Sequence, residues 1–148
     1  MSSAPEFRWN DSFLLGYAPM DDTHREFVEV VEAMRAATDD ELAGHIDVFL
    51  KHAEEHFEQE RALMAATEFP AMDCHVKEHN AVLHSVRQVK ELLAANGDAA
   101  VCRPLIEELI RWFPAHTDYL DASLAQWTMK KQYGAAPVVL RRGVAHPA

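Results

Sequence analysis

The sequence predicts an all-α protein, an up-down-up-down four-helix bundle with an N-terminal arm and a short C-terminal tail. Apolar residues recur at intervals of three and four along four long stretches, which is the spacing of the inward face of a bundled helix. Alternating runs of β-branched residues are nearly absent before positions 138–140. With 148 residues, 49% of them hydrophobic, the chain is long enough to fold as a single domain over 1–148.

The four helices are expected at about 19–37, 39–66, 70–95 and 104–130. Three of these stretches are introduced by a proline, the residue favoured in the first turn of a helix: Pro19, Pro70 and Pro104. Thr38 and Glu41 form a capping-box pattern that opens the second helix, and Asn96-Gly97 signals the end of the third. Because the connections are short, neighbouring helices should be antiparallel.

Two non-helical segments should flank the bundle, which spans about 19–130. The arm, residues 1–18, contains large apolar side chains able to pack on the helices: Phe7, Trp9, Phe13, Leu14, Leu15 and Tyr17. The tail, about 132–148, contains Gly134, Pro137, Gly143 and Pro147, so we expect it to be non-helical.

Charge and composition argue against several classes of function. The net charge is −10, from 14 Lys+Arg and 24 Asp+Glu, which disfavours nucleic acid and anionic membranes as partners. No apolar run approaches the ~20 residues that span a bilayer, and Met1 to Asn10 has no signal-peptide pattern. Cys74 and Cys102 form neither a CxxC site nor a disulfide framework. We therefore expect a cytoplasmic protein.

Nine histidines are the unusual feature of the composition, and five of them fall on the inward apolar stripes. These five come from all four expected helices: His24, His56, His75, His79 and His116. Glu60 lies four residues after His56, on the same face. A single inward histidine is most often a core residue with a partner. Five imidazoles and a carboxylate cannot all satisfy one another, so the pattern predicts a metal centre.

Neither the Glu-x-x-His pairs of ferritin-like sites nor the His-Glu-x-x-His of zinc proteases is present. The histidines instead lie in four segments: Met-Asp-Asp-Thr-His at 20–24, His-Phe-Glu-Gln-Glu at 56–60, His-Val-Lys-Glu-His at 75–79, and Trp-Phe-Pro-Ala-His-Thr-Asp-Tyr-Leu-Asp at 112–121. In this order and spacing they resemble the hemerythrin family, in its single-domain bacterial form. The resemblance extends from residue 9 to about 130.

The resemblance implies two non-haem iron ions, bridged by carboxylates and an oxo or hydroxo group. By position, one iron would be bound by His75, His79 and His116, the other by His24 and His56, with Glu60 and Asp121 bridging the two. Counting bonds leaves one octahedral position open, on the two-histidine iron.

An open position on a redox-active metal can bind a small diatomic ligand. The resemblance implies that this ligand is O2, bound reversibly, and that the protein is an oxygen carrier or store rather than an enzyme. Two alternatives stay open. One is a sensor of O2, nitric oxide or redox state, and the other is a di-iron oxidoreductase acting on peroxide or nitric oxide. No feature of the sequence identifies a protein partner.

Asp121 is awkwardly placed for a ligand. It lies five residues after His116, about 140° around an ideal helix, yet a bridging carboxylate must face the same site. We therefore predict a π-bulge between Trp112 and Asp121, a stretch in which Pro114 also removes one helical hydrogen bond.

The resemblance also places Trp112, Phe113 and Thr117 at the O2 pocket. Thr117 stands where the family usually has a large aliphatic residue. The remaining histidines are predicted not to be ligands: His45, His52, His84 and His146. His52 is the ambiguous one, because it lies one helical turn before His56.

Overall fold

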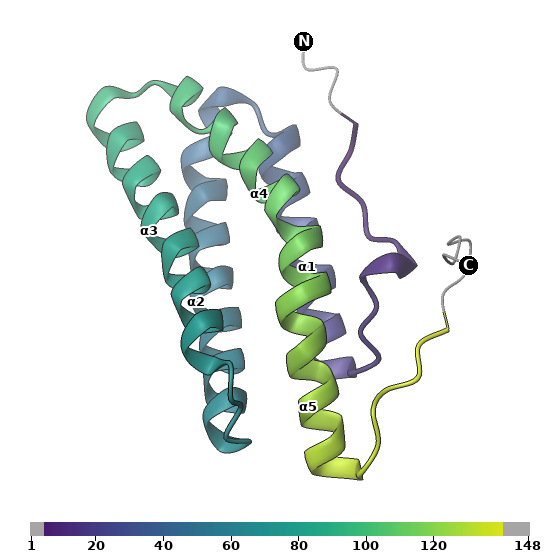
Figure 1. Cartoon of the computed structure of the whole chain (residues 1–148). Helices are drawn as coiled ribbons and strands as arrows, with labels where there is room; N and C mark the ends of the chain where they lie inside the picture. The colour runs from purple at the N-terminus through teal and green to yellow at the C-terminus, as the bar shows by residue number, and fades with distance from the viewer. Residues whose placement is uncertain (1–4, 141–148) are drawn as a thin grey trace.

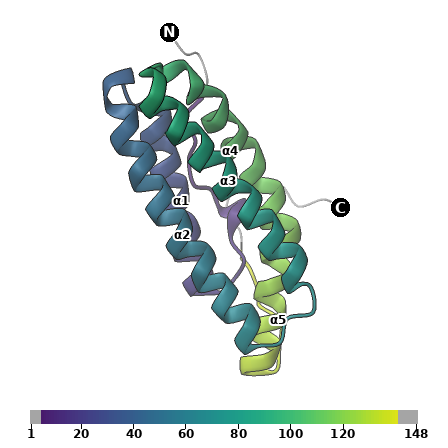
Figure 2. The same cartoon turned by 90° about the vertical axis from the view of Figure 1, so that its left-hand side faces the viewer.

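The computed structural model describes residues 5–140, and the helices within that range alternate in direction along an elongated bundle (Figure 1). The α-helices are α1 (Ala18–Ala36), α2 (Leu42–Ala66), α3 (Met72–Asn96), α4 (Arg103–His116) and α5 (Ala122–Tyr133). A π-helical segment, Thr117–Asp121, joins α4 to α5, so these two form the fourth rod of the bundle (Figure 2). Among the described residues there is no strand, and the predicted all-α four-helix bundle is confirmed.

The predicted helix bounds need three corrections. The Thr38–Glu41 box is present, with the Thr38 N–H donating to Glu41 Oε1 at 2.9 Å, but Asp39–Glu41 is a 3-10 turn and α2 begins at Leu42. Pro70 lies in the turn before α3 instead of in its first helical turn, because Glu68 at φ 54° bends the chain there. The fourth rod continues beyond 130 to Tyr133, where Gly134 ends it at φ +77°.

The core is divided into two apolar clusters along the bundle. One contains Phe27, Phe57 and Phe113 together with most of the buried aliphatic residues. The other, at the end where α2 leads into α3, is built around Met20, Met64 and Leu124. On each rod, the histidines of interest lie near the boundary between the residues of the two clusters. None of the described helices has the length and apolarity needed to cross a bilayer.

The N-terminal arm packs on the bundle as predicted, with Phe7, Phe13 and Leu15 buried and Trp9 partly buried. The buried carboxylate of Asp21 accepts hydrogen bonds from the backbone N–H groups of Leu15 and Gly16 at 2.8 and 3.1 Å, which fixes the entry into α1.

The tail returns along this arm (Figure 1). Gly16 has φ +82°, and a Cβ at this position would lie 2.8 Å from Pro137 Cβ, so only glycine fits. Residues 134–140 are non-helical, as predicted. The remainder of the tail, with His146, lies outside the described residues.

Candidate metal centre

Seven buried polar side chains, contributed by all four rods, meet between the two apolar clusters. None is more than 4% exposed: His24, His56, Glu60, His75, His79, His116 and Asp121. They are the seven residues that the sequence pattern and the family resemblance nominated as ligands. The structure therefore brings the whole nominated set into one place.

The donor atoms fall into two overlapping groups. In the three-histidine group, donor atoms of Glu60, His75, His79, His116 and Asp121 all lie within 4.8 Å of one another. The two-histidine group consists of His24, His56 and Glu60 on the same criterion. Asp121 also contacts both groups. Its Oδ2 is 3.1 Å from His24 Nε2 in the two-histidine group, and its Oδ1 is 3.0 Å from His75 Nε2 in the three-histidine group. Both carboxylates thus lie between the groups.

Helical spacing accounts for most of this arrangement. His56 and Glu60 are one turn apart on α2, with Nε2 and Oε2 at 2.5 Å, and His75 and His79 are one turn apart on α3. Asp121 reaches the cluster differently. The π-helical segment begins directly after His116, and the Ala122 N–H donates to the Thr117 carbonyl, five residues back.

The wider π turn brings Asp121 back to the face of the helix that carries His116, with Asp121 Oδ1 at 3.2 Å from His116 Nε2. The predicted irregularity is confirmed, and it explains how a residue at a spacing of five joins the cluster.

Many of these donor atoms are buried without a hydrogen-bond partner. They include both ring nitrogens of His24 and of His75, Glu60 Oε1 and Asp121 Oδ1. His24 Nε2 forms an ion pair with Asp121 Oδ2 at 3.1 Å when the ring is protonated, although the geometry is not that of a regular hydrogen bond. Each unpaired buried polar group costs about 1–3 kcal/mol, and clustered imidazole and carboxylate donors are typical ligands of metal ions. The residues therefore fit a pair of bound metal ions.

The two carboxylates control the electrostatics of the cluster. Burial lowers the pKa of His24, but Asp121 and Glu60 outweigh it and raise that pKa to about 10. The same balance raises the pKa of His75 to about 9. Burial lowers the pKa of His79 to about 3, with His116 and His75 acting in the same direction.

Burial raises the pKa of Asp121, but His116 and His24 outweigh it and hold the pKa of that carboxyl well below its usual range. Burial and Asp121 raise the pKa of Glu60, and His56 and His24 more than reverse this. Both carboxylates are thus kept ionised, in the form that attracts and binds a cation.

Aromatic rings hold the imidazoles in place. Phe113 packs edge-on against His24, with ring centroids 5.6 Å apart, and stacks on Phe27 at 4.8 Å. Trp112 stacks on His116 at 4.2 Å. Of the residues predicted for the O2 pocket, Phe113 therefore lies at the two-histidine group and Trp112 at the three-histidine group. Thr117 is fully buried, and its hydroxyl has no hydrogen-bond partner.

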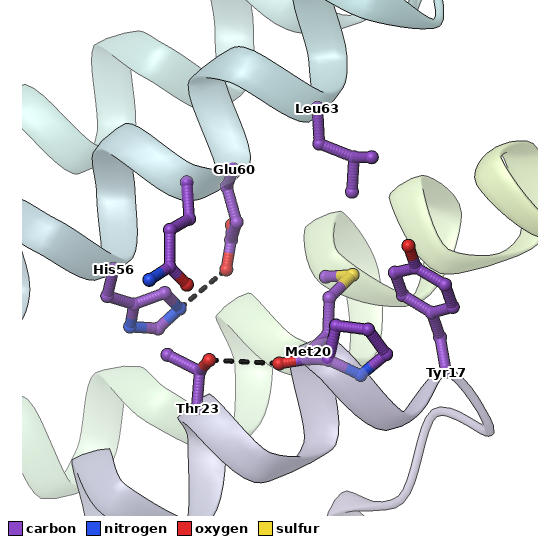
Figure 3. A pocket seen from close by; sticks show the side chains of 8 residues that line it. Tyr17, Met20, Thr23, His56, Glu60 and Leu63 are labelled. Carbon is purple, nitrogen blue, oxygen red and sulfur yellow. Dashed lines mark hydrogen bonds and ion pairs between the residues drawn. The ribbon is translucent and has the colours of Figure 1, made fainter.

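A cavity of about 240 Å³ reaches the two-histidine group, a feature that the sequence pattern does not predict. His56 and Glu60 line it, together with Tyr17, Pro19, Met20, Thr23, Gln59 and Leu63 (Figure 3). Its walls come from the start of α1 and from α2. The cavity depends on how these two helices face each other, which is not visible in either sequence segment.

The structure also shows where the other histidines lie. His52 is largely buried, with its ring 5.8 Å from that of His56, but it belongs to neither donor group, and its Nε2 is 3.5 Å from Glu26 Oε2. His45 is half-buried and His84 is exposed.

His52 and His56 offer a matched pair of substitutions. We expect His56→Ala to lose metal from the two-histidine group, because a donor atom disappears there. His52→Ala should keep the full metal content, since its ring contributes no donor to either group. Metal analysis of the two purified variants tests this, and exchanged outcomes would mean that the ligand on α2 is wrongly assigned.

The chain is similar to known proteins along most of its length. The family model of the hemerythrin HHE cation binding domain matches residues 15–127. A bacteriohemerythrin from Ralstonia nicotianae is 35% identical over 127 residues, which is 86% of this chain and 92% of that protein. A hemerythrin subunit from Sipunculus nudus is 32% identical over 81 residues, 55% of this chain and 66% of that protein.

Proposed function

We propose that this chain, which belongs to the hemerythrin family, holds two iron ions and binds O2 reversibly as a carrier or store. The observation that carries the proposal is the division of the buried donors into a three-histidine and a two-histidine group that share carboxylates. When bound there, iron supplies a redox-active metal with one coordination position free for a small ligand.

The unequal division of the ligands determines which side stays open. His75, His79 and His116 would hold one iron, His24 and His56 the other, and Glu60 and Asp121 would bridge them. The second iron would have one imidazole fewer, and its ligands His56 and Glu60 line the cavity (Figure 3). A diatomic molecule would thus have an entry route to the side with the free position.

The lining of this cavity favours binding over catalysis. Among the described residues that form it, Tyr17 is the one ionisable side chain that is not a nominated ligand. Met20 and Leu63 are apolar. Reduction of peroxide or nitric oxide needs protons delivered to the substrate. A wall with one ionisable side chain besides the nominated ligands supports a carrier or store more than an oxidoreductase.

The visible spectrum of the protein tests the proposal. The iron-loaded protein is reduced without oxygen, exposed to air, and then returned to an oxygen-free atmosphere. We expect an absorption band that appears with O2 and disappears on its removal, in a protein with two irons per chain. Direct and permanent conversion to the ferric form would contradict a carrier and favour the sensor or oxidoreductase.

Thr117 should influence how long the O2-binding form survives. Its buried, unpaired hydroxyl can hold a water molecule and so bring a proton donor to the site, and protons promote irreversible oxidation. We therefore expect Thr117→Ile to oxidise in air several-fold more slowly than the wild type, since an apolar wall tends to stay dry. The decay of the oxygenated spectrum measures this rate.

Thr128 provides the control for this experiment. It is fully buried on α5 and its hydroxyl is also unpaired, but along the chain it lies seven residues after Asp121, whereas Thr117 directly follows His116. Thr128→Ile should decay at the wild-type rate. Stopped-flow measurement of O2 entry detects any crowding by the larger side chain, and equal decay in all three proteins would show that Thr117 does not affect the site.

A further inference from the structure

We infer that Glu78 is a positioning residue of the three-histidine group, which orients the ring of His116 so that Nε2 faces the metal. This inference rests on the proposed iron centre. Glu78 lies on α3, directly before His79, and is not one of the nominated ligands. Its side chain is 39% exposed, so it lies at the edge of the cluster.

One oxygen of Glu78 accepts two hydrogen bonds from α4. His116 Nδ1 is 2.7 Å from Glu78 Oε1, and Trp112 Nε1 donates to the same oxygen at 3.0 Å. Trp112 and His116 are one helical turn apart, and their rings stack at 4.2 Å with 22° between the planes. The carboxylate therefore links α3 to a preassembled pair of rings on α4.

This contact determines the tautomer of His116. A carboxylate oxygen accepts hydrogen bonds, so Nδ1 is the donor in this contact, and in the neutral ring Nε2 then keeps the lone pair. Nε2 points into the cluster, 3.2 Å from Asp121 Oδ1 and 3.0 Å from His79 Nε2. Nε2 of His116 is thus left free to bind a metal.

Glu78 gives His116 a hydrogen-bond partner on its outer ring nitrogen, which three other histidines of the cluster lack. The Nδ1 atoms of His24, His56 and His75 are buried without a hydrogen-bond partner. A carboxylate on the outer nitrogen of a ligating histidine fixes the ring and makes the inner nitrogen a better donor. Among these four imidazoles, His116 is the one held in this way.

The packing around Glu78 makes its hydrogen bonds important. α3 and α4 leave a mainly apolar groove of about 310 Å³ between them, and Glu78 and Trp112 both line it. Side-chain packing is therefore incomplete where His116 must be kept in position. The Glu78 contacts cross this gap next to the cluster.

Titration of the metal-free protein with Co²⁺, followed by its visible absorption, tests the inference. Loss of a carboxylate behind a ligating histidine typically weakens metal binding about 10–100-fold, and we expect this for Glu78→Ala. The Co²⁺ affinity of Glu78→Gln should fall between those of the wild type and Glu78→Ala, because the glutamine amide oxygen still accepts a hydrogen bond. Glu108→Ala should match the wild type, since Glu108 lines the same groove but pairs with Arg111.

NMR of the Zn²⁺-loaded protein supplies a readout that general destabilisation would not move. In the wild type, the Nδ1 proton of His116 should be protected and visible, and in Glu78→Ala it should exchange with solvent and disappear. An unchanged proton signal, or equal Co²⁺ affinity in Glu78→Ala and the wild type, would overturn the inference. If Glu78→Ala does not fold, wild-type affinity in Glu78→Gln has the same meaning. A wild-type protein that binds no Co²⁺ would overturn the proposed centre itself.

Discussion

Glu60→Ala is expected to remove metal from both halves of the centre, lowering the iron content from two ions per chain to less than one. Glu60 is the residue whose donor atoms belong to both groups. Its Oε2 is 2.5 Å from His56 Nε2, and its Oε1 is 3.1 Å from His75 Nε2. Because one carboxylate contacts both sides, its removal cannot be confined to one iron. Loss of a single histidine, in contrast, takes a donor from one group.

Charge adds to the expected effect of this substitution. Asp121 and Glu60 raise the pKa values of His24 and His75. In the metal-free cluster the negative charge of these two carboxylates is therefore balanced by the imidazoles. Removing Glu60 leaves one carboxylate to offset two bound metal ions. Glu60→Gln keeps the shape of the side chain but lacks the charge, so it should also lose most of the iron.

Metal analysis, with circular dichroism to verify folding, measures the outcome. Glu58→Ala is the matched control, because Glu58 lies two residues away on α2, is exposed and pairs with Arg61. This variant should retain two irons per chain. A Glu60→Ala protein that also retains two irons would show that Glu60 is not a ligand shared by the two groups.

Sequence spacing predicted the fold and most of the cluster because both depend on local helical geometry. His56 with Glu60, and His75 with His79, are one turn apart, so any helix through them brings each pair onto one face. Asp121 could be nominated only by resemblance, since its spacing from His116 does not fit an α-helix. The same misfit nevertheless predicted the π-helical segment that the structure shows.

What could not be predicted depends on contacts between helices. Glu78 looks like a surface residue of α3, and its role becomes visible only where His116 and Trp112 from α4 meet its carboxylate. The cavity at His56 likewise depends on the way α1 faces α2. The position of Pro70 depends on the backbone of Glu68, whose φ of 54° is unusual for a residue other than glycine.

Metal removal should lower the thermal stability of the protein substantially. Without metal, several buried donor atoms have no partner, and a ligand that binds only the folded state stabilises it in proportion to the logarithm of its concentration. For one metal site at a free metal concentration about 1,000 times Kd, this amounts to ~4 kcal/mol. For a chain of this size, at about 2–4 °C per kcal/mol, loss of one such site should lower Tm by roughly 8–16 °C.

His79→Ala should reduce this metal-dependent stabilisation substantially, because it removes one donor of the three-histidine group. The substitution also removes an imidazole that stacks on Phe57 at 3.9 Å, so the metal-free variant will itself be less stable. The informative quantity is therefore the difference in Tm between the loaded and chelated forms of each protein, in which this packing loss cancels. His84→Ala, an exposed histidine on the same helix, should keep the wild-type difference. A full difference in His79→Ala would remove His79 from the ligand set, because a bundle that gains as much from metal without that imidazole does not use it to bind the ion.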